Sequence, residues 1–169
     1  MKKNLQNALL LAMGLMTTVT FAQDWNVDSR TRIDMSGDND KMVTNQRATL
    51  GATWGGSDWG VHVSSDVNYM LGSGDASMGI YEAYASADLM GYASVTAGRQ
   101  ALNYGSGAII SSNDWNANRT TWDGFTFGLD LDMADVTFGY ASTSGEDADL
   151  SGKSQMWLNA AKGEGDWNA

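Results

Sequence analysis

The five arginines of this chain, set among 20 acidic residues, are the groups most able to do chemistry. A guanidinium group binds carboxylates and phosphates through paired hydrogen bonds, and carboxylates bind cations or arginines in turn. Between positions 25 and 35 the charged residues recur at every second position, as Asp28, Arg30, Arg32 and Asp34. Period-two spacing places them on one face of a β-strand. A water-filled space lined by such a face can sort solutes by size and local charge.

Other chemistries have weaker support. His62 and Ser64 share one strand face, but nothing marks an oxyanion hole or an activated nucleophile, so we predict no enzyme. The acidic segments 36–40 and 145–149 lack the ligand spacing of a calcium loop, and solvated acidic surface is the favoured interpretation. The chain has no cysteine, which excludes thiolate sites. No cofactor or metal is predicted, and the absence of a polybasic stretch argues against nucleic acid as a partner.

The N-terminus has the three parts of a secretory signal. Lys2 and Lys3 precede an apolar run over 9–16, and Thr20-Phe21-Ala22 forms a small-x-small cleavage site. We therefore divide the chain into a signal peptide, 1–22, and a mature part, 23–169. Loss of the two lysines changes the net charge from −10 to −12.

The mature part alternates apolar and polar residues in segments of about ten. We expect a strand in each of 25–35, 42–54, 59–71, 81–89 and about 93–102, with three more strands around 125–129, 136–140 and 156–160. In the fourth segment, Tyr81, Ala83, Ala85, Ala87 and Leu89 are expected to point outward, and Glu82, Tyr84, Ser86 and Asp88 inward. Residues 72–79 are expected to form a loop. Gly98 is a candidate bulge, which leaves the direction of Arg99 open.

These features together predict an all-β fold, an antiparallel transmembrane β-barrel of the outer-membrane type with about eight strands present. The predicted connections alternate between short and long, with the longest at 103–119. Aromatic residues such as Trp25, Trp59 and Tyr69 fall near predicted strand ends, as interfacial girdles do. Twenty glycines and no proline suit sheets joined by tight turns. The expected location is the bacterial outer membrane, after export through the inner membrane.

The last residues bear on strand number. Asp166-Trp167 resembles the start of a ninth strand, and a barrel of this type needs an even strand count. We therefore expect the chain to be the front part of a larger barrel. The alternative is a complete eight-stranded barrel with a short tail.

One segment resembles the alginate export family of bacterial outer-membrane porins. The matching positions are Gly98-Arg99-Gln100, Tyr104-Gly105, Asp114-Trp115, Arg119 and Asp123-Gly124. The resemblance implies a monomeric barrel that passes a polar or anionic solute, with the long loop near the channel and basic side chains lining it. The sequence departs from the family in its length and in its charge-mixed predicted lumen, so alginate as the solute does not follow.

The predicted function is a porin-like channel for diffusion or export of polar or anionic solutes, including oligo- or polysaccharides. The predicted partners are outer-membrane lipid and such a solute. The predicted pore-lining residues are Arg30, Arg32, Arg47, Asp66, Glu82, Arg99, Gln100, Asp114, Arg119 and Asp123. Two alternatives stay open: a small closed barrel with a structural or adhesive role, in which the charges simply pair, and a secreted soluble β-sandwich that acts as a binding module.

Overall fold

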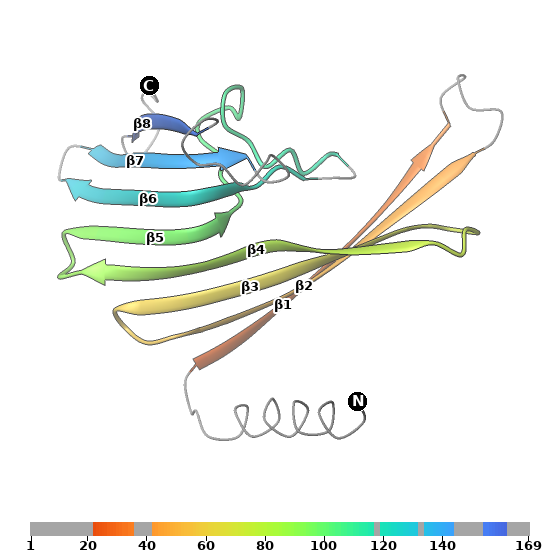
Figure 1. Ribbon diagram of the computed structural model, residues 1–169, viewed down its shortest axis with the longest axis horizontal. Helices are drawn as coiled ribbons and strands as arrows, with labels where there is room; N and C mark the ends of the chain where they lie inside the picture. Colours follow the sequence, from red (N-terminus) through yellow and green to blue (C-terminus); the bar gives the residue numbers. More distant parts are fainter. Residues whose placement is uncertain (1–21, 36–41, 117–118, 132–133, 144–153, 162–169) are drawn as a thin grey trace.

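A computed structural model describes residues 22–35, 42–116, 119–131, 134–143 and 154–161 of the chain. Within them, eight antiparallel strands form one sheet in sequence order (Figure 1). The strands are β1 (Ala22–Asp34), β2 (Val43–Gly55), β3 (Trp59–Met70), β4 (Ala76–Leu89), β5 (Ala93–Gln100), β6 (Trp122–Leu131), β7 (Ala134–Thr143) and β8 (Gln155–Ala161). The predicted signal peptide, both acidic segments and the predicted ninth strand lie mainly or wholly outside the described residues.

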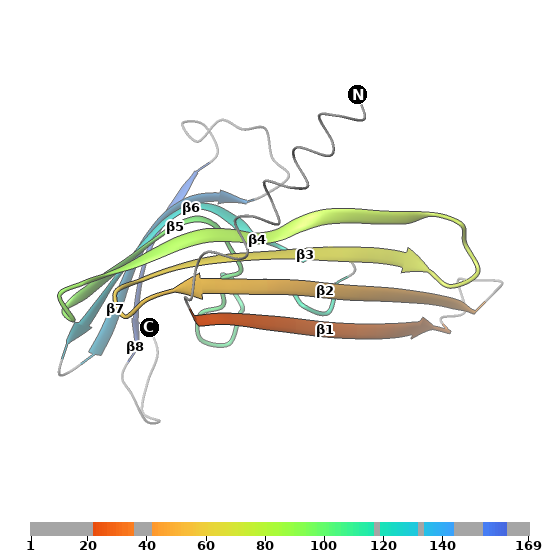
Figure 2. The ribbon, with the colours of Figure 1, turned by 90° about the horizontal axis from the view of Figure 1, so that it is seen from below.

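The strict alternation of side chains gives the sheet two different faces. We call outer the face that carries Val61, Val63, Phe125 and Phe127, whose side chains are all exposed. The opposite, inner face carries Arg47, Ser64 and Asp66, which are buried. Figure 2 shows the strongly curved sheet, with β5–β8 turned away from the plane of β1–β4. The usual arrangement, polar outside and apolar inside, is inverted here.

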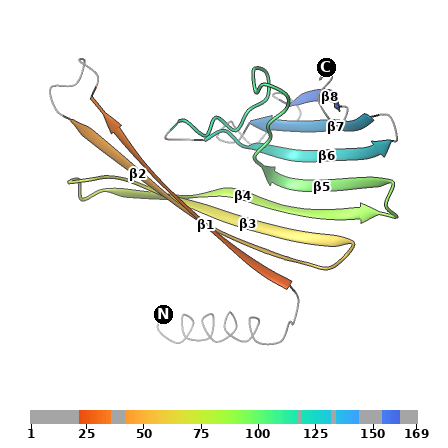
Figure 3. The same ribbon diagram turned by 180° about the vertical axis from the view of Figure 1, so that it is seen from behind.

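The all-β antiparallel prediction is confirmed for the described residues. β1 and β8 lie at opposite edges of the sheet and do not pair with each other, so the sheet is open (Figure 3). The described strands form one sheet, whereas the β-sandwich alternative requires two sheets packed face to face.

β4 differs from its predicted form in two ways. It begins at Ala76, so the connection predicted over 72–79 is shorter than expected. The register also shifts between Ser64 and Ser65, which pair with Glu82 and Ile80 and leave Tyr81 as an extra residue. This β-bulge puts Tyr81 on the inner face beside Glu82, where it is buried. The prediction that Tyr81 points outward was therefore wrong.

Gly98 does not form the expected bulge. It pairs in register with Tyr84 and Gly124, and it has a φ of 127°, which disfavours any side chain. A Cβ atom at this position would overlap the carbonyl oxygen of Ala83. The glycine is thus needed for close approach of β4 and β5. Its neighbour Arg99 is aligned with outer-face Ala83 and with Asp123.

The three short hairpins are staggered in a regular way. Gly60, Ser86, Thr96 and Thr126 are aligned across β3 to β6. β3 extends one residue past this row, to Trp59, whereas β4 extends three residues, to Leu89, and β6 five, to Leu131. Each hairpin therefore ends two residues beyond the previous one. With ~3.4 Å per residue and ~4.8 Å between strands, a line through the hairpin ends is inclined at about 35° to the perpendicular of the strands.

Candidate functional site: a loop across the inner face

The segment between β5 and β6 crosses the inner face, and we call residues 101–121 the crossing loop. It leaves the end of β5 and extends toward the β1–β4 half of the sheet (Figure 1). Two main contacts, one apolar and one polar, anchor its described residues on the inner face, and further hydrogen bonds join it to the arginines of β1 and β2 and to Glu82. Together they hold the loop across the concave side of the sheet.

The apolar contact involves the first half of the loop and the strands β6 to β8. Ile110 is buried against Trp122 and Ala141, and Leu102, Tyr104 and Trp157 pack around this cluster. Trp157 covers Gly139, where a Cβ atom would overlap the indole ring. Burial raises the pKa of the Tyr104 hydroxyl. This cluster fixes the loop on the β6–β8 side.

An internal brace keeps the first half of the loop compact. The Asn103 side-chain amide donates to Ser112 Oγ at 2.9 Å, and the Ser112 backbone N–H donates to Asn103 Oδ1 at 3.1 Å. The Thr120 backbone N–H donates to the Ser112 carbonyl oxygen at 2.7 Å. Ser112 is almost completely buried, so these bonds satisfy groups that water does not reach.

The polar contact is centred on Arg119, which is buried on the inner face of β2 to β4. Its guanidinium group forms a paired interaction with Asp66, with Nε 3.1 Å from Oδ2, and donates to Thr49 Oγ1 at 3.0 Å. The Thr49 hydroxyl donates to Asp66 at 2.6 Å. The ring of Tyr81 stacks on the guanidinium at 3.1 Å, and Asp114 Oδ1 lies 3.7 Å away. The bulge in β4 thus supplies the aromatic side of the Arg119 site.

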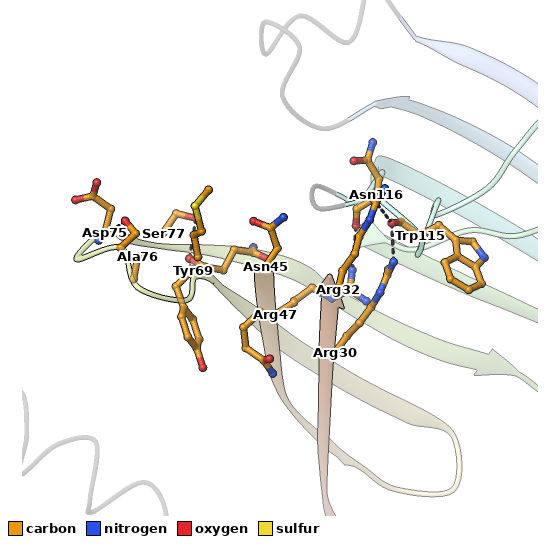
Figure 4. A pocket seen from close by; sticks show the side chains of 14 residues that line it. Arg30, Arg32, Asn45, Arg47, Tyr69, Asp75, Ala76, Ser77, Trp115 and Asn116 are labelled. Atoms are coloured by element: carbon orange, nitrogen blue, oxygen red, sulfur yellow. Dashed lines mark hydrogen bonds between the residues drawn. The ribbon is translucent and has the colours of Figure 1, made fainter. Parts of the chain in front are cut away.

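Arg30, Arg32 and Arg47 form an arginine cluster beside the loop tip, residues 113–116. Arg30 donates to the carbonyl oxygens of Asp114 and Trp115, the latter at 2.7 Å. Arg32 donates to the Trp115 carbonyl at 3.4 Å, and Arg47 donates to those of Asp114 and Asn116 at 3.3 and 3.4 Å. Figure 4 shows Arg30 and Arg32 directed toward these residues. The carbonyl oxygens carry no net charge, so these bonds do not neutralise the cluster; the nearby carboxylates of Asp66 and Asp114 interact electrostatically with Arg47.

A cavity of about 430 Å³ adjoins the arginine cluster. Its lining includes all three arginines together with the amides of Asn45, Asn68 and Asn116, the hydroxyls of Ser73 and Ser77, Trp115, and one carboxylate, Asp75. The Trp115 side chain is 81% exposed, and the Arg30 guanidinium lies 5.1 Å from its ring centre. This combination of cations, hydrogen-bonding side chains and an aromatic ring suits a polar, negatively charged solute.

His62 belongs to a separate cluster near the start of the crossing loop. Its Nδ1 hydrogen-bonds Thr53 Oγ1 at 2.7 Å, and its Nε2 lies 3.6 Å from Glu82 Oε2. Glu82 also accepts a hydrogen bond from the Ala101 backbone N–H at 3.1 Å. Both ring nitrogens thus face groups other than Ser64, whose buried Oγ has no hydrogen-bond partner. The arrangement braces the loop rather than activating the serine.

The structure brings together most of the predicted pore-lining residues. Around the crossing loop on the inner face lie Arg30, Arg32, Arg47, Asp66, Glu82, Asp114 and Arg119. Sequence reasoning missed Tyr81 and Thr49. For Tyr81 no local signal was available, because a bulge reverses the face without altering the alternation of residue types. For Thr49, nothing in the sequence distinguishes it from the other polar residues of its strand.

Arg99, Asp123 and Gln100 are placed differently. Arg99 and Asp123 form a two-bond ion pair, with both N···O distances 2.7 Å, and the register assigns this pair to the outer face. Gln100 is buried and accepts a hydrogen bond from the Thr126 hydroxyl at 2.9 Å. We therefore leave Arg99 and Asp123 out of the candidate site.

No known protein family matches the chain, and no curated protein matches its sequence. In the part of the chain that the structure describes, no helix is long and apolar enough to cross a membrane. The same residues include no group of three or more His, Cys, Asp or Glu side chains suited to a metal ion.

Proposed function

We propose that the chain forms at least part of an outer-membrane β-barrel channel, through which polar or anionic solutes pass the arginine cluster. In this proposal the inner face lines the passage, the crossing loop narrows it, and the outer face contacts lipid. The short resemblance of residues 98–124 to the alginate export family also favours a channel for such solutes.

The inverted distribution of polarity supports the membrane part of the proposal. Large apolar side chains are exposed along the outer face of every strand except β5, whereas charged side chains such as Arg47 and Asp66 are buried on the inner face. In water such an outer face would be unfavourable by about 25 cal/mol for each Å² of exposed apolar surface. A lipid bilayer removes that cost, because its hydrocarbon replaces the water.

The dimensions of the sheet agree with those of a membrane-spanning barrel. If the staggered hairpin ends lie in one plane parallel to the membrane, the strands tilt by about 35°, as strands do in closed barrels. The outer-face aromatics Trp59 and Tyr69 are ten residues apart on β3. At this tilt they are separated by roughly 28 Å along the membrane normal, close to the ~25 Å apolar band of such barrels.

The observation that carries the channel proposal is the arginine cluster. Arg30 and Arg47 are directly opposite each other in the register of β1 and β2. Like charges in this position destabilise a sheet, and the hydrogen bonds of both groups reach uncharged carbonyl oxygens. The carboxylates of Asp66 and Asp114 interact electrostatically with Arg47, but Asp66 is already paired with Arg119. A sheet that keeps such an arrangement beside a cavity is suited to attracting anions. Charges that merely fill a narrow barrel would be expected to neutralise each other, as Arg119 and Asp66 do.

Conductance across a planar lipid bilayer tests the proposal. We expect the purified chain to form ion channels that prefer anions in a salt gradient. The double substitution Arg30→Glu and Arg32→Glu should abolish or reverse this preference, because it exchanges two cations for two anions at the cavity. Arg99→Glu, on the outer face, should leave the preference unchanged. Absence of channels in protein shown to be inserted as a closed barrel would reject the proposal and favour a structural or adhesive role.

A further inference from the structure

The loop tip is held by hydrogen bonds in which its carbonyl oxygens accept from the arginine cluster, and a stronger acceptor could replace these oxygens. Residues 113–116 form a turn in which the Asn116 backbone N–H donates to the Asn113 carbonyl at 2.9 Å. Three of the four residues, Asp114, Trp115 and Asn116, present their carbonyl oxygens to the arginine cluster. The tip therefore occupies donors on all three guanidinium groups.

A charged oxyanion competes well for such donors. The existing guanidinium–carbonyl bonds carry charge on the donor alone, whereas a carboxylate or phosphate adds a charged acceptor and can accept a pair of parallel bonds from one guanidinium. An oxyanion also offsets the repulsion between Arg30 and Arg47, which an uncharged carbonyl oxygen does only weakly. The exchange of acceptors is thus favourable when the solute carries negative charge.

The cavity gives the oxyanion access to the same donors. Arg30, Arg32 and Arg47 all line it, as do Trp115 and Asn116 of the tip. A solute in the cavity would thus lie between the cluster and the tip without having to open another part of the fold. Figure 4 shows these side chains around the cavity.

The rest of the crossing loop is held by other groups. Arg119 is paired with Asp66 and Thr49, and Ile110 is buried against Trp122. Neither contact uses the arginine cluster. Loss of the carbonyl bonds would leave both loop contacts intact. The tip would still be attached through the Asp114 carboxylate, which lies 3.7 Å from Arg119 Nη1 and 3.5 Å from the Tyr81 hydroxyl, so it would loosen around this point.

We propose that the loop tip is a latch, which the carboxylate or phosphate group of a passing solute opens by displacing the tip carbonyls from Arg30, Arg32 and Arg47. Binding of the oxyanion and widening of the passage are then the same event. This inference rests on the proposed channel function, because it assigns a regulatory role to the same site.

Fluorine NMR of the full chain in detergent micelles tests the latch. The protein is labelled with 5-fluorotryptophan, and the Trp115 resonance is assigned by its loss in Trp115→Phe. Added inorganic phosphate or acetate should shift the Trp115 resonance, while that of Trp157 in the apolar contact stays in place. Sodium chloride of equal ionic strength is the control for screening. A response to one or both probes also shows whether phosphate, carboxylate or either is the preferred group.

Arg30→Gln should move the Trp115 resonance toward its released position without any anion and weaken the response to phosphate about tenfold. Arg99→Gln, which removes an arginine from the outer face, should respond like the parent chain. An equal response to chloride, or no response in the folded chain, would overturn the latch. If the protein conducts anions but its Trp115 resonance does not respond, the latch is rejected and the channel proposal is retained. A clear response in a protein that forms no channels would support the latch and reject the channel.

Discussion

Two ion pairs of the same kinds of residue occupy contrasting environments. The Arg119 and Asp66 side chains are only 8% and 11% exposed, whereas those of Arg99 and Asp123 are 33% and 37% exposed. A buried guanidinium that loses its partner keeps its full desolvation cost, whereas one that is a third exposed keeps less of that cost. The two pairs should thus respond very differently to removal of the carboxylate charge.

We expect Asp66→Asn to lower the free energy of unfolding by about 3 kcal/mol, because it leaves Arg119 buried without a counter-charge. Asp123→Asn is the matched control and should cost less than about 1 kcal/mol. Urea unfolding in detergent micelles, followed by tryptophan fluorescence, measures both. Equal effects of the two substitutions would mean that the Arg119 site is not a buried anchor.

Among the structural elements, the crossing loop depends on a single buried aliphatic side chain for its apolar contact. Ile110 is 6% exposed, and its chain neighbour Ile109 is 93% exposed. Truncation of a buried isoleucine removes transfer free energy and leaves a cavity, whereas truncation of an exposed one does neither. A comparison of Ile109 with Ile110 therefore separates the contribution of burial to stability from that of residue type.

Ile110→Ala is expected to destabilise docking of the loop by about 2–4 kcal/mol. Ile109→Ala should change it by no more than about 0.5 kcal/mol. Hydrogen exchange at the Tyr104 amide, which donates to the Ile110 carbonyl at 3.2 Å, reports on docking directly. Faster exchange only in the Ile110 variant would confirm the expectation, and equal exchange rates in the two variants would contradict it.

The same elements show what a sequence can and cannot reveal. Alternation placed Arg30, Arg47 and Asp66 on one face, because each strand side faces a different environment. It could not place Tyr81, since one inserted residue changes the face without changing composition. Alternation also could not show which part of the sheet the crossing loop contacts. The contact between Arg119 and Asp66 depends on the curvature of the whole sheet, which no local pattern encodes.

At the scale of the whole molecule, the proposed lipid contact predicts that the effect of a substitution on the outer face depends on its depth in the bilayer. Val63 lies near the middle of the span between Trp59 and Tyr69, and Tyr69 lies at its border. The cost of a charge in a bilayer rises steeply toward the centre, because water and headgroups can reach only the edges.

We therefore expect Val63→Arg to destabilise the protein in lipid vesicles by about 2–4 kcal/mol and Tyr69→Arg by about 1 kcal/mol or less. Chemical unfolding in vesicles of defined thickness measures both variants against the parent chain. If both arginines were tolerated equally, the outer face would be exposed to water, and the membrane proposal would fail.

The sequence separation across the crossing loop also affects how the protein folds. Every strand pairs with its neighbour in the chain, but the loop brings Arg30 to Asp114 over 84 positions and Thr49 to Arg119 over 70. Contacts between distant residues carry a larger entropic cost and form late. Docking of the loop is therefore expected to follow pairing of the sheet. If the proposed channel forms, it would pass during maturation through a state in which the sheet is assembled but the loop does not yet narrow the passage. The rate of docking would set how long ions can leak through that state.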